Sequence, residues 1–330
     1  MSKNKKDCKE CLHKTSVGGQ ALIEGIMMQG PKGAAVSVRT PDGTIDTEMV
    51  DFKHAKDKFK PLGWPLIRGV VAYIESMLFG YKCLMMSAEK SGLEDLEESE
   101  ENMSKLDKWL NDHINKKVLG VLTAFASVLG MLLAFLLFFY LPTIAVNFIN
   151  KLSGDILTNY RALFEGTIRM IIFVAYIAAV SLMKDIKRTF MYHGAEHKTI
   201  FCYEQGCELT VENVRKQSRF HPRCGTSFIF VILIISVVIS SAISVTWPEL
   251  RDQTVIWIAI KVLILPFITG LSYEFIKYAG RHDNVFVKIL SAPGLWMQRL
   301  TTKEPDDDMI EVALEAFKAV ITDNPEDDAV

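Results

Sequence analysis

The spacing of apolar positions along the chain predicts four membrane-spanning helices. The first apolar run, Val118 to Leu141, contains no ionisable side chain and is long enough to cross a hydrocarbon core of about 30 Å. Two more runs of spanning length cover Thr226 to Trp247 and Thr254 to Ile276, and a shorter one covers Ile168 to Met183. Only the short run fits equally well as a buried helix of a soluble protein. We therefore expect an integral membrane protein.

The N-terminal part has a different pattern, which predicts a small mixed region. The alternating segments AAVSVRT and TIDTEMV flank the turn residues PDG and predict a β-hairpin. A helix is expected from Pro65 to Lys90, with proline in its first turn and a charged stripe formed by Arg68, Glu75, Lys82 and Glu89. Such a helix typically lies in the membrane interface, whereas a re-entrant or fifth spanning helix would carry its central charges into lipid at high cost.

The expected fold class is thus an all-α polytopic membrane protein with about four transmembrane helices and a small N-terminal α+β cytoplasmic region. No cleavable signal peptide is expected at the polar, lysine-rich start. The predicted organisation is a flexible leader (1–16), an N-terminal region with hairpin and interfacial helix (17–92), an acidic linker (93–117), a four-helix membrane domain (118–276) that includes a loop at 184–225, and a C-terminal segment (277–330) with an amphipathic helix at Met309–Ile321 and an acidic tail.

Charge determines the expected orientation. The formal net charge is −2, which gives no reason to expect nucleic acid as a partner. Lys and Arg are concentrated before the first span and between the second and third spans, and the opposite loops contain few. The positive-inside rule then places both termini and the 184–225 loop in the cytoplasm. The six cysteines would face the reducing side of the membrane, so structural disulfides are not expected.

Residues that could bind a metal are gathered in the 184–225 loop. In the segment HGAEH, His193 and His197 are four positions apart on an expected helix, and Glu196 projects from the same face. The segment HPRC, just before the third span, adds His221 and Cys224. Because the helix that continues the second span and the entrance to the third are joined by this one loop, their side chains can meet. Imidazole and thiolate ligands suit zinc or another late transition metal.

The ligand count separates two kinds of site. The pattern His-x-x-Glu-His is the inverted zinc-hydrolase motif, in which the glutamate acts as a general base. Three protein ligands with Glu196 free would indicate hydrolysis, whereas ligation by all of His193, His197, His221 and Cys224 would close the tetrahedron and indicate a structural site. A hydrogen-bonded network without any metal is the simplest alternative. The glutamate between the two histidines favours catalysis.

Other polar groups could support this site. Glu274 lies at the inner end of the fourth span, and His282 and Asp283 follow it. They could orient a ligand or a substrate headgroup, although an ordinary helix C-terminus explains them more simply. Lys261, about 10 Å inside its span, is expected to extend its ammonium to the outer membrane surface.

Several long motifs resemble one known family. The segments VGGQALIEGIMMQGP, PLIRGVVAYIESMLFG, YHGAEHKTI, RFHPRCGTSF and APGLWMQRLTTKEP resemble the YqhQ-like bacterial membrane proteins, the domain-of-unknown-function family numbered 1385. The resemblance runs from about Val17 to the C-terminal helix. It implies a bacterial inner-membrane location and a metal-dependent enzyme, which is how that family has been catalogued by prediction. It implies no particular substrate.

The expected function is a metal-dependent hydrolase at the cytoplasmic membrane surface, with zinc as its ion and a lipid-linked or peptide substrate. The alternative is a non-enzymatic membrane assembly or regulatory factor whose metal clamps the second and third spans together. A small transporter ranks last, because transporters usually show inverted repeats around broken helices and we find no such repeat in the sequence.

Overall fold

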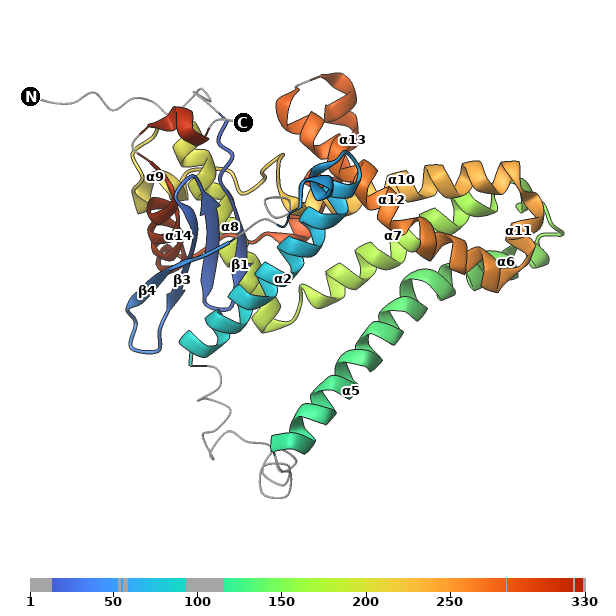
Figure 1. Ribbon diagram of the computed structural model, residues 1–330, viewed down its shortest axis with the longest axis horizontal. Coiled ribbons are helices and arrows are strands. Elements are labelled where there is room, and N and C mark those ends of the chain that lie inside the picture. Colours follow the sequence, from blue (N-terminus) through green and yellow to red (C-terminus); the bar gives the residue numbers. More distant parts are fainter. Residues whose placement is uncertain are drawn as a thin grey trace, which may run out of the picture. The chain divides into compact units, whose positions relative to one another are not determined.

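The computed structural model describes residues 14–52, 55, 59–92, 116–282, 284–322 and 324–328, which fall into two compact units (Figure 1). Most of the predicted leader and linker lies outside the described residues. We call the units the sheet unit and the helical unit and describe each by itself. The sheet unit takes in Met1–Leu93, Ile177–Val231 and Thr269–Val330, and the helical unit takes in Glu94–Tyr176 and Ile232–Ile268.

The sheet unit is built on four antiparallel strands in the order β1-β2-β3-β4. The predicted hairpin is confirmed as β3 and β4, with Arg39 opposite Ile45 and Gly43 in the connecting turn at φ +85°. Strands β1 and β2 were not predicted, because glycines interrupt the alternation of apolar and polar residues in that segment. The strands are β1 (Gly18–Leu22), β2 (Gly25–Gly30), β3 (Gly33–Arg39) and β4 (Ile45–Val50).

Helices cover both faces of this sheet (Figure 1). Neighbouring residues of a strand point to opposite faces, and in β2 Met28 packs with the cluster formed by helices α8 (Lys184–Glu204) and α14 (Asp307–Val320), while Met27 packs with α2 (Ile67–Lys90). The amphipathic helix α14 confirms the predicted C-terminal helix within two residues. Each fully buried side chain of this size contributes about 1.5–3 kcal/mol, so the sheet holds α8 firmly, and α8 carries HGAEH.

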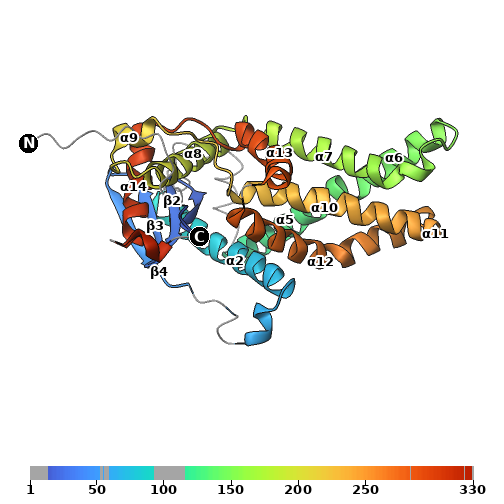
Figure 2. The ribbon, with the colours of Figure 1, turned by 90° about the horizontal axis from the view of Figure 1, so that it is seen from above.

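Five of the described helical segments are long and apolar enough to cross a membrane, which supports the expected membrane protein. Four of them overlap the predicted spans, with shifted ends, and the fifth is α2. Figure 2 shows α7, α10 and α12 alongside one another. The remaining helices are α5 (Lys116–Phe135), a π-helical turn (Leu136–Tyr140), α6 (Leu141–Leu152), α7 (Arg161–Val180), α9 (Val211–Arg215), α10 (Gly225–Thr246), α11 (Pro248–Asp252), α12 (Thr254–Arg281) and α13 (Val285–Thr301).

One expectation about helix continuity is wrong. We expected the helix of the second span to continue through HGAEH, but it ends at Val180, and α8 begins at Lys184 after an extended Met183 with ψ 136°. Neither proline nor glycine occurs in the interruption. The break separates the part of the chain in the apolar helix from the part that packs on the sheet. Because this packing involves residues far apart in the chain, the local sequence does not predict the break.

Within the helical unit, Lys261 does not extend to the surface as expected. It is 4% exposed and forms an ion pair with Glu165, and its ammonium also lies 3.1 Å from the Thr143 hydroxyl. The same carboxylate accepts hydrogen bonds from Trp257 Nε1 at 3.0 Å and from Arg169 at 3.1 Å. An opposite charge with several donors inside the unit offsets the cost of burying the ammonium. The prediction failed because the partner lies on another helix.

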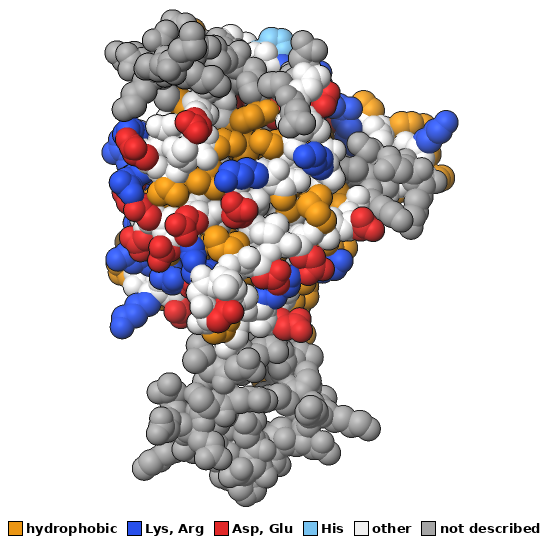
Figure 3. All heavy atoms as spheres, turned by 90° about the vertical axis from the view of Figure 1, so that its left-hand side faces the viewer, with side chains coloured by type: hydrophobic (Ala, Val, Ile, Leu, Met, Phe, Trp, Pro, Cys, Tyr) orange, Lys and Arg blue, Asp and Glu red, His pale blue; other side chains and the backbone are white. Residues whose placement is uncertain are grey.

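The outer face of the sheet unit carries mixed charge. Figure 3 shows acidic and basic side chains interspersed over this face. Exposed ion pairs of the sheet unit include Arg215 with Asp307 and Lys318 with Glu315.

Candidate metal centre

Helix α8 is held so that its histidine face is buried. Gly194 lies against the connection between α13 and α14, where an added Cβ would overlap the backbone carbonyl of Lys303. The Lys303 amide donates to the Phe190 carbonyl at 2.8 Å. Only a residue without a side chain permits this approach of two backbones. The glycine within HGAEH thereby positions the histidines on either side of it.

Each of these histidines donates a hydrogen bond from one ring nitrogen to a backbone carbonyl. His193 Nδ1 lies 2.9 Å from the Thr301 oxygen, and His197 Nδ1 lies 2.6 Å from the Arg219 oxygen. Because a carbonyl only accepts, the proton of each neutral ring resides on Nδ1. The Nε2 atom of each ring then carries a free lone pair, the tautomer that carbonyl partners fix in histidine metal ligands.

The free lone pairs converge on Cys224. Its Sγ lies 3.2 Å from His193 Nε2, and one donor atom from each of His193, His197 and Cys224 falls within 4.8 Å of the others. Among the described residues, His197 Nε2 is buried without a hydrogen-bond partner. An unpaired buried acceptor is costly, and a metal ion would satisfy it. The donor set of two imidazoles and one thiolate fits zinc.

Burial also sets the charge state that ligation requires. His197 is only 1% exposed, and desolvation lowers its pKa below the ordinary value of histidine. The imidazole is therefore neutral at neutral pH, as a metal ligand must be.

The structure places His221 outside this group. Its Nε2 lies 3.6 Å from Glu204 Oε2, and its backbone amide and carbonyl both bind the Gln298 side chain at 2.7 Å. Burial lowers the pKa of His221. Glu204 also pairs with Arg223. The ring of His221 thus belongs to a neighbouring polar network and does not join the donor atoms of His193, His197 and Cys224.

Glu196 is buried against strand β1. It is 5% exposed, accepts a hydrogen bond from the Gly19 backbone, and its Oε2 has no partner among the described residues. A Cβ at position 19 would lie 3.1 Å from the Glu196 Cδ and closer still to Met27 O and Met28 Sδ, so glycine allows the carboxylate to approach the strand. Burial raises the pKa of Glu196.

The other polar groups singled out from the sequence lie elsewhere. Glu274 forms an ion pair with Arg68 of α2. His282 is exposed and stacks on Tyr278 with 4.1 Å between ring centroids. Asp283 lies outside the described residues. Cys207 is disulfide-bonded, so the expectation of no disulfides, which rested on the compartment alone, is wrong at this position.

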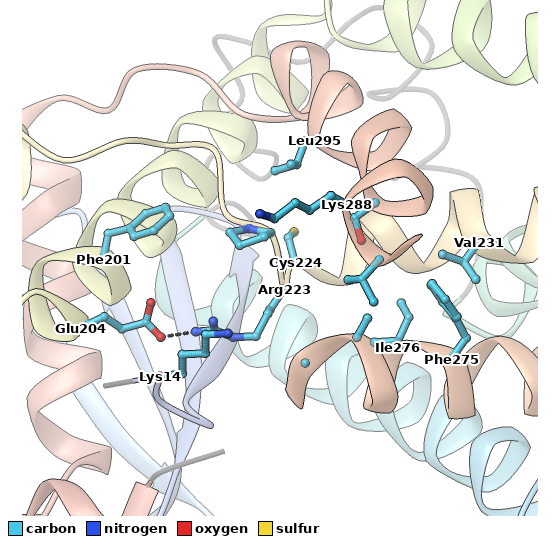
Figure 4. Close-up of a pocket in the computed structure, with 15 residues that line it drawn as sticks. Lys14, Phe201, Glu204, Arg223, Cys224, Val231, Phe275, Ile276, Lys288 and Leu295 are labelled. Atoms are coloured by element: carbon cyan, nitrogen blue, oxygen red, sulfur yellow. Dashed lines mark hydrogen bonds and ion pairs between the residues drawn. The ribbon is translucent and has the colours of Figure 1, made fainter. Parts of the chain in front are cut away.

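A cavity of about 380 Å³ reaches the site from the side of Cys224 (Figure 4). Phe201 and Glu204 of α8 line it together with Arg223, and residues of α10, α12 and α13 form its other wall. The thiol of Cys224 is therefore accessible from a space large enough for a small ligand.

The whole-chain comparisons agree with the resemblance seen in the motifs. Residues 64–323 match the family described as "Protein of unknown function (DUF1385)". The chain belongs to this family. It is 35% identical over 310 residues to the "Uncharacterized protein YqhQ" of Bacillus subtilis (strain 168), with 92% of each chain covered. No solved structure matches. These relatives carry no named activity, so the function of this DUF1385 protein has to be inferred from its site.

Sequence reasoning about this DUF1385 chain missed the groups that support the ligands. The carbonyls of Thr301 and Arg219 leave no signal in a sequence, because every residue has one. Glu204 offered a weak signal, since it lies seven positions after His197 on the same helix face. Gln298, within the motif APGLWMQRL, could not be assigned without knowing that α13 contacts the 207–224 segment.

Proposed function

We propose that this protein is a membrane metalloenzyme, a hydrolase that holds a divalent transition ion, zinc first, with His193, His197 and Cys224. The observation that carries the proposal is the convergence of one ring nitrogen from each of His193 and His197 with the Cys224 sulfur, all within 4.8 Å of one another. Two carbonyls fix the required tautomers, and the buried Nε2 of His197 has no other partner among the described residues.

The number of ligands favours catalysis over a purely structural role. Structural zinc sites are almost always closed by four protein ligands, whereas catalytic sites combine three with an open position. His221, the fourth ligand expected from the sequence, is not among the three residues whose donor atoms lie within 4.8 Å of one another, and its Nε2 lies 3.6 Å from Glu204 Oε2. When bound, the ion would supply Lewis-acid chemistry to a carbonyl or phosphoryl group. The cavity at Cys224 gives a substrate access to this position.

Glu196 is the residue we assign to proton transfer. A buried carboxylate whose pKa lies above its ordinary value is closer to the range in which a base takes up and releases a proton at neutral pH. The Gly19 backbone amide orients the carboxylate, and its Oε2 is left without a hydrogen bond among the described residues. Its place between the two histidines matches the zinc-hydrolase pattern.

We place this chemistry at the cytoplasmic face of the bacterial inner membrane. Lys and Arg are concentrated in the 184–225 loop and before the first span, and such residues favour the cytoplasmic side. The substrate would reach the site at the membrane surface as a lipid-linked or peptide molecule.

A structural clamp is the second candidate, and one observation favours it. The ligands come from two elements, α8 and the residue before α10, and His197 is almost fully buried. An ion there would tie the two elements together in a non-enzymatic assembly or regulatory factor. Cobalt substitution separates the candidates, because an open coordination position changes the visible spectrum when an anion is added and a closed one does not.

Metal content tests the proposal. Protein purified in detergent after growth with zinc should contain stoichiometric metal, and His197→Ala should retain only traces because it removes a buried ligand. His282→Ala is the matched control, since this exposed histidine lies outside the ligand group. Elemental analysis after dialysis gives the answer. Equal metal in wild type and His197→Ala, or none in wild type, would contradict the proposed site.

A further inference from the structure

The cavity beside Cys224 has two chemically different ends (Figure 4). Val231, Phe275 and Ile276 lie together at one end, and Glu204, Arg223 and Lys14 lie at the other. Lys288 extends between them towards the side of Cys224. A space that is apolar at one end and charged at the other suits an amphipathic ligand.

The apolar end is formed by the termini of membrane helices. Val231 lies in the first turns of α10, and Phe275 and Ile276 lie in the last turns of α12. Both helices are candidate membrane spans, so these residues occupy the level at which hydrocarbon meets the headgroup region. Leu295 of α13 adds a further apolar wall. A hydrocarbon chain can enter this end without leaving an apolar environment.

The charged end is lined by basic side chains. Arg223 and Lys288 lie there with one carboxylate among the described lining residues, Glu204. Glu204 already pairs with Arg223 and accepts the Thr15 amide at 2.9 Å. Lys288, in contrast, has no ion pair among the described residues. The uncompensated charge favours an anion, and Lys and Arg together are typical ligands of phosphate.

We propose that this cavity binds a lipid with a phosphate headgroup, with its chain against Phe275 and Ile276 and its phosphate between Lys288 and Arg223. The headgroup then lies next to Cys224. Such a lipid would be the substrate class of the proposed enzyme, and this assignment as substrate rests on the proposed function. Binding itself requires no metal. A free phosphate would use only the charged end, and a peptide would leave the cations without an anion.

Three soluble probes distinguish the sources of the phosphate. They are dihexanoyl phosphatidic acid, dihexanoyl phosphatidylcholine and glycerol 3-phosphate, titrated calorimetrically into the full-length protein in a nonionic detergent. Phosphatidic acid should bind tightest. Glycerol 3-phosphate should bind at least about tenfold more weakly, because it lacks the acyl chains that the apolar end would bury. Phosphatidylcholine should also bind more weakly, because its choline cation opposes the positive end.

Variants assign the binding to this cavity. Lys288→Gln should weaken phosphatidic acid binding about tenfold by removing a charge-assisted contact. Arg299→Gln removes a cation from the exposed side of the same helix and does not line the cavity, so it should change binding less than about twofold. Ala279→Phe, which fills the apolar end, should reduce phosphatidic acid binding and leave glycerol 3-phosphate binding unchanged.

The outcomes separate this inference from the metal site. His193 is not among the residues that line the cavity. The His193→Ala protein should therefore bind phosphatidic acid as wild type does even though it loses metal. If wild type holds metal but Lys288→Gln and Arg299→Gln bind phosphatidic acid equally, the lipid site is overturned and the metal site stands. Equal affinity for glycerol 3-phosphate and phosphatidic acid would show a free-phosphate site and overturn the lipid. Equal affinity for phosphatidylcholine would overturn the requirement for an anionic headgroup.

Discussion

At the scale of the residue, the site depends on which ring nitrogen of each histidine is free. The sequence predicted His193, His197 and Cys224 from residue type and spacing, and the structure brings these three together. It could not show that His221 would turn to Glu204. That outcome depends on Gln298, which is 77 positions from His221 in the chain and binds both of its backbone groups.

Thiol reactivity gives a prediction at this scale. Burial raises the pKa of Cys202 to about 11, so this thiol stays protonated at pH 8 and forms the reactive thiolate only as the pH approaches 11. Cys224 is partly exposed. In metal-free protein at pH 8, iodoacetamide should therefore label Cys224 much faster than Cys202, by about tenfold or more, as measured by peptide mass spectrometry.

Adding zinc should then protect Cys224, because the thiolate would be a ligand. Cys202 serves as the internal control and should stay unlabelled with or without the ion. Labelling of Cys224 at the same rate in both conditions would count against its role as a ligand.

At the scale of the element, the sequence pattern predicted the helices and strands whose formation depends on residues close together in the chain. The β3–β4 hairpin follows from alternation around a turn, and the apolar helices follow from length and composition. Strands β1 and β2 were not predicted because glycines mask the alternation of apolar and polar residues in them. The break between α7 and α8 was not predicted because none of its residues disfavours a helix. Both are fixed by packing on the rest of the sheet unit.

Helix α8 supplies the prediction at this scale. Gly194→Ala should lower the free energy of unfolding by about 1–3 kcal/mol and reduce bound metal, because the methyl group would displace α8 from the Lys303 backbone. The matched control is Gly130→Ala in α5, where a Cβ would meet nothing within 4 Å. Alanine is the better helix former, so the control should be neutral or stabilising.

Thermal unfolding in detergent and metal content would be measured for both variants. A Gly194→Ala protein as stable and as metal-loaded as wild type would show that the close approach of the two backbones is not needed to position the histidines.

At the scale of the whole molecule, the shared core of the sheet unit limits the membrane topology. Ile26 of β2, Ile200 of α8 and Phe317 of α14 pack in one cluster, so these three elements lie on the same side of the membrane. An even number of crossings must then separate the sheet from α8, and α8 from α14. Helices α10 and α12 satisfy the second condition. The first is satisfied by the span Phe125–Leu152, which ends with α6, and by α7 if α2 does not cross.

The sequence alone could not decide between four and five spans, because the composition of α2 suits either. The contacts of α2 favour four membrane spans. Phe79 and Cys83 pack on the sheet, and the exposed apolar side chains of Ile74, Leu78 and Tyr81 are available to the membrane interface. The interfacial helix expected from the charged stripe is thus compatible with the core of the sheet unit.

Labelling from one side of the membrane tests this topology. Single-cysteine reporters Asp42→Cys in the β3–β4 turn and Asp308→Cys in α14 should both react only after the inner membrane is opened. Ile156→Cys, in the connection between α6 and α7, should react with an impermeant maleimide in intact spheroplasts. Opposite accessibility of the first two reporters would mean that α2 crosses.

The central claim is that His193, His197 and Cys224 share one metal ion, and X-ray absorption at the edge of the bound metal tests it most directly. An ion shared by these residues should show one sulfur scatterer at about 2.3 Å and nitrogen or oxygen scatterers at about 2.0–2.1 Å, and the sulfur should be lost in Cys224→Ser. A coordination shell without sulfur, or one that Cys224→Ser leaves unchanged, would contradict it.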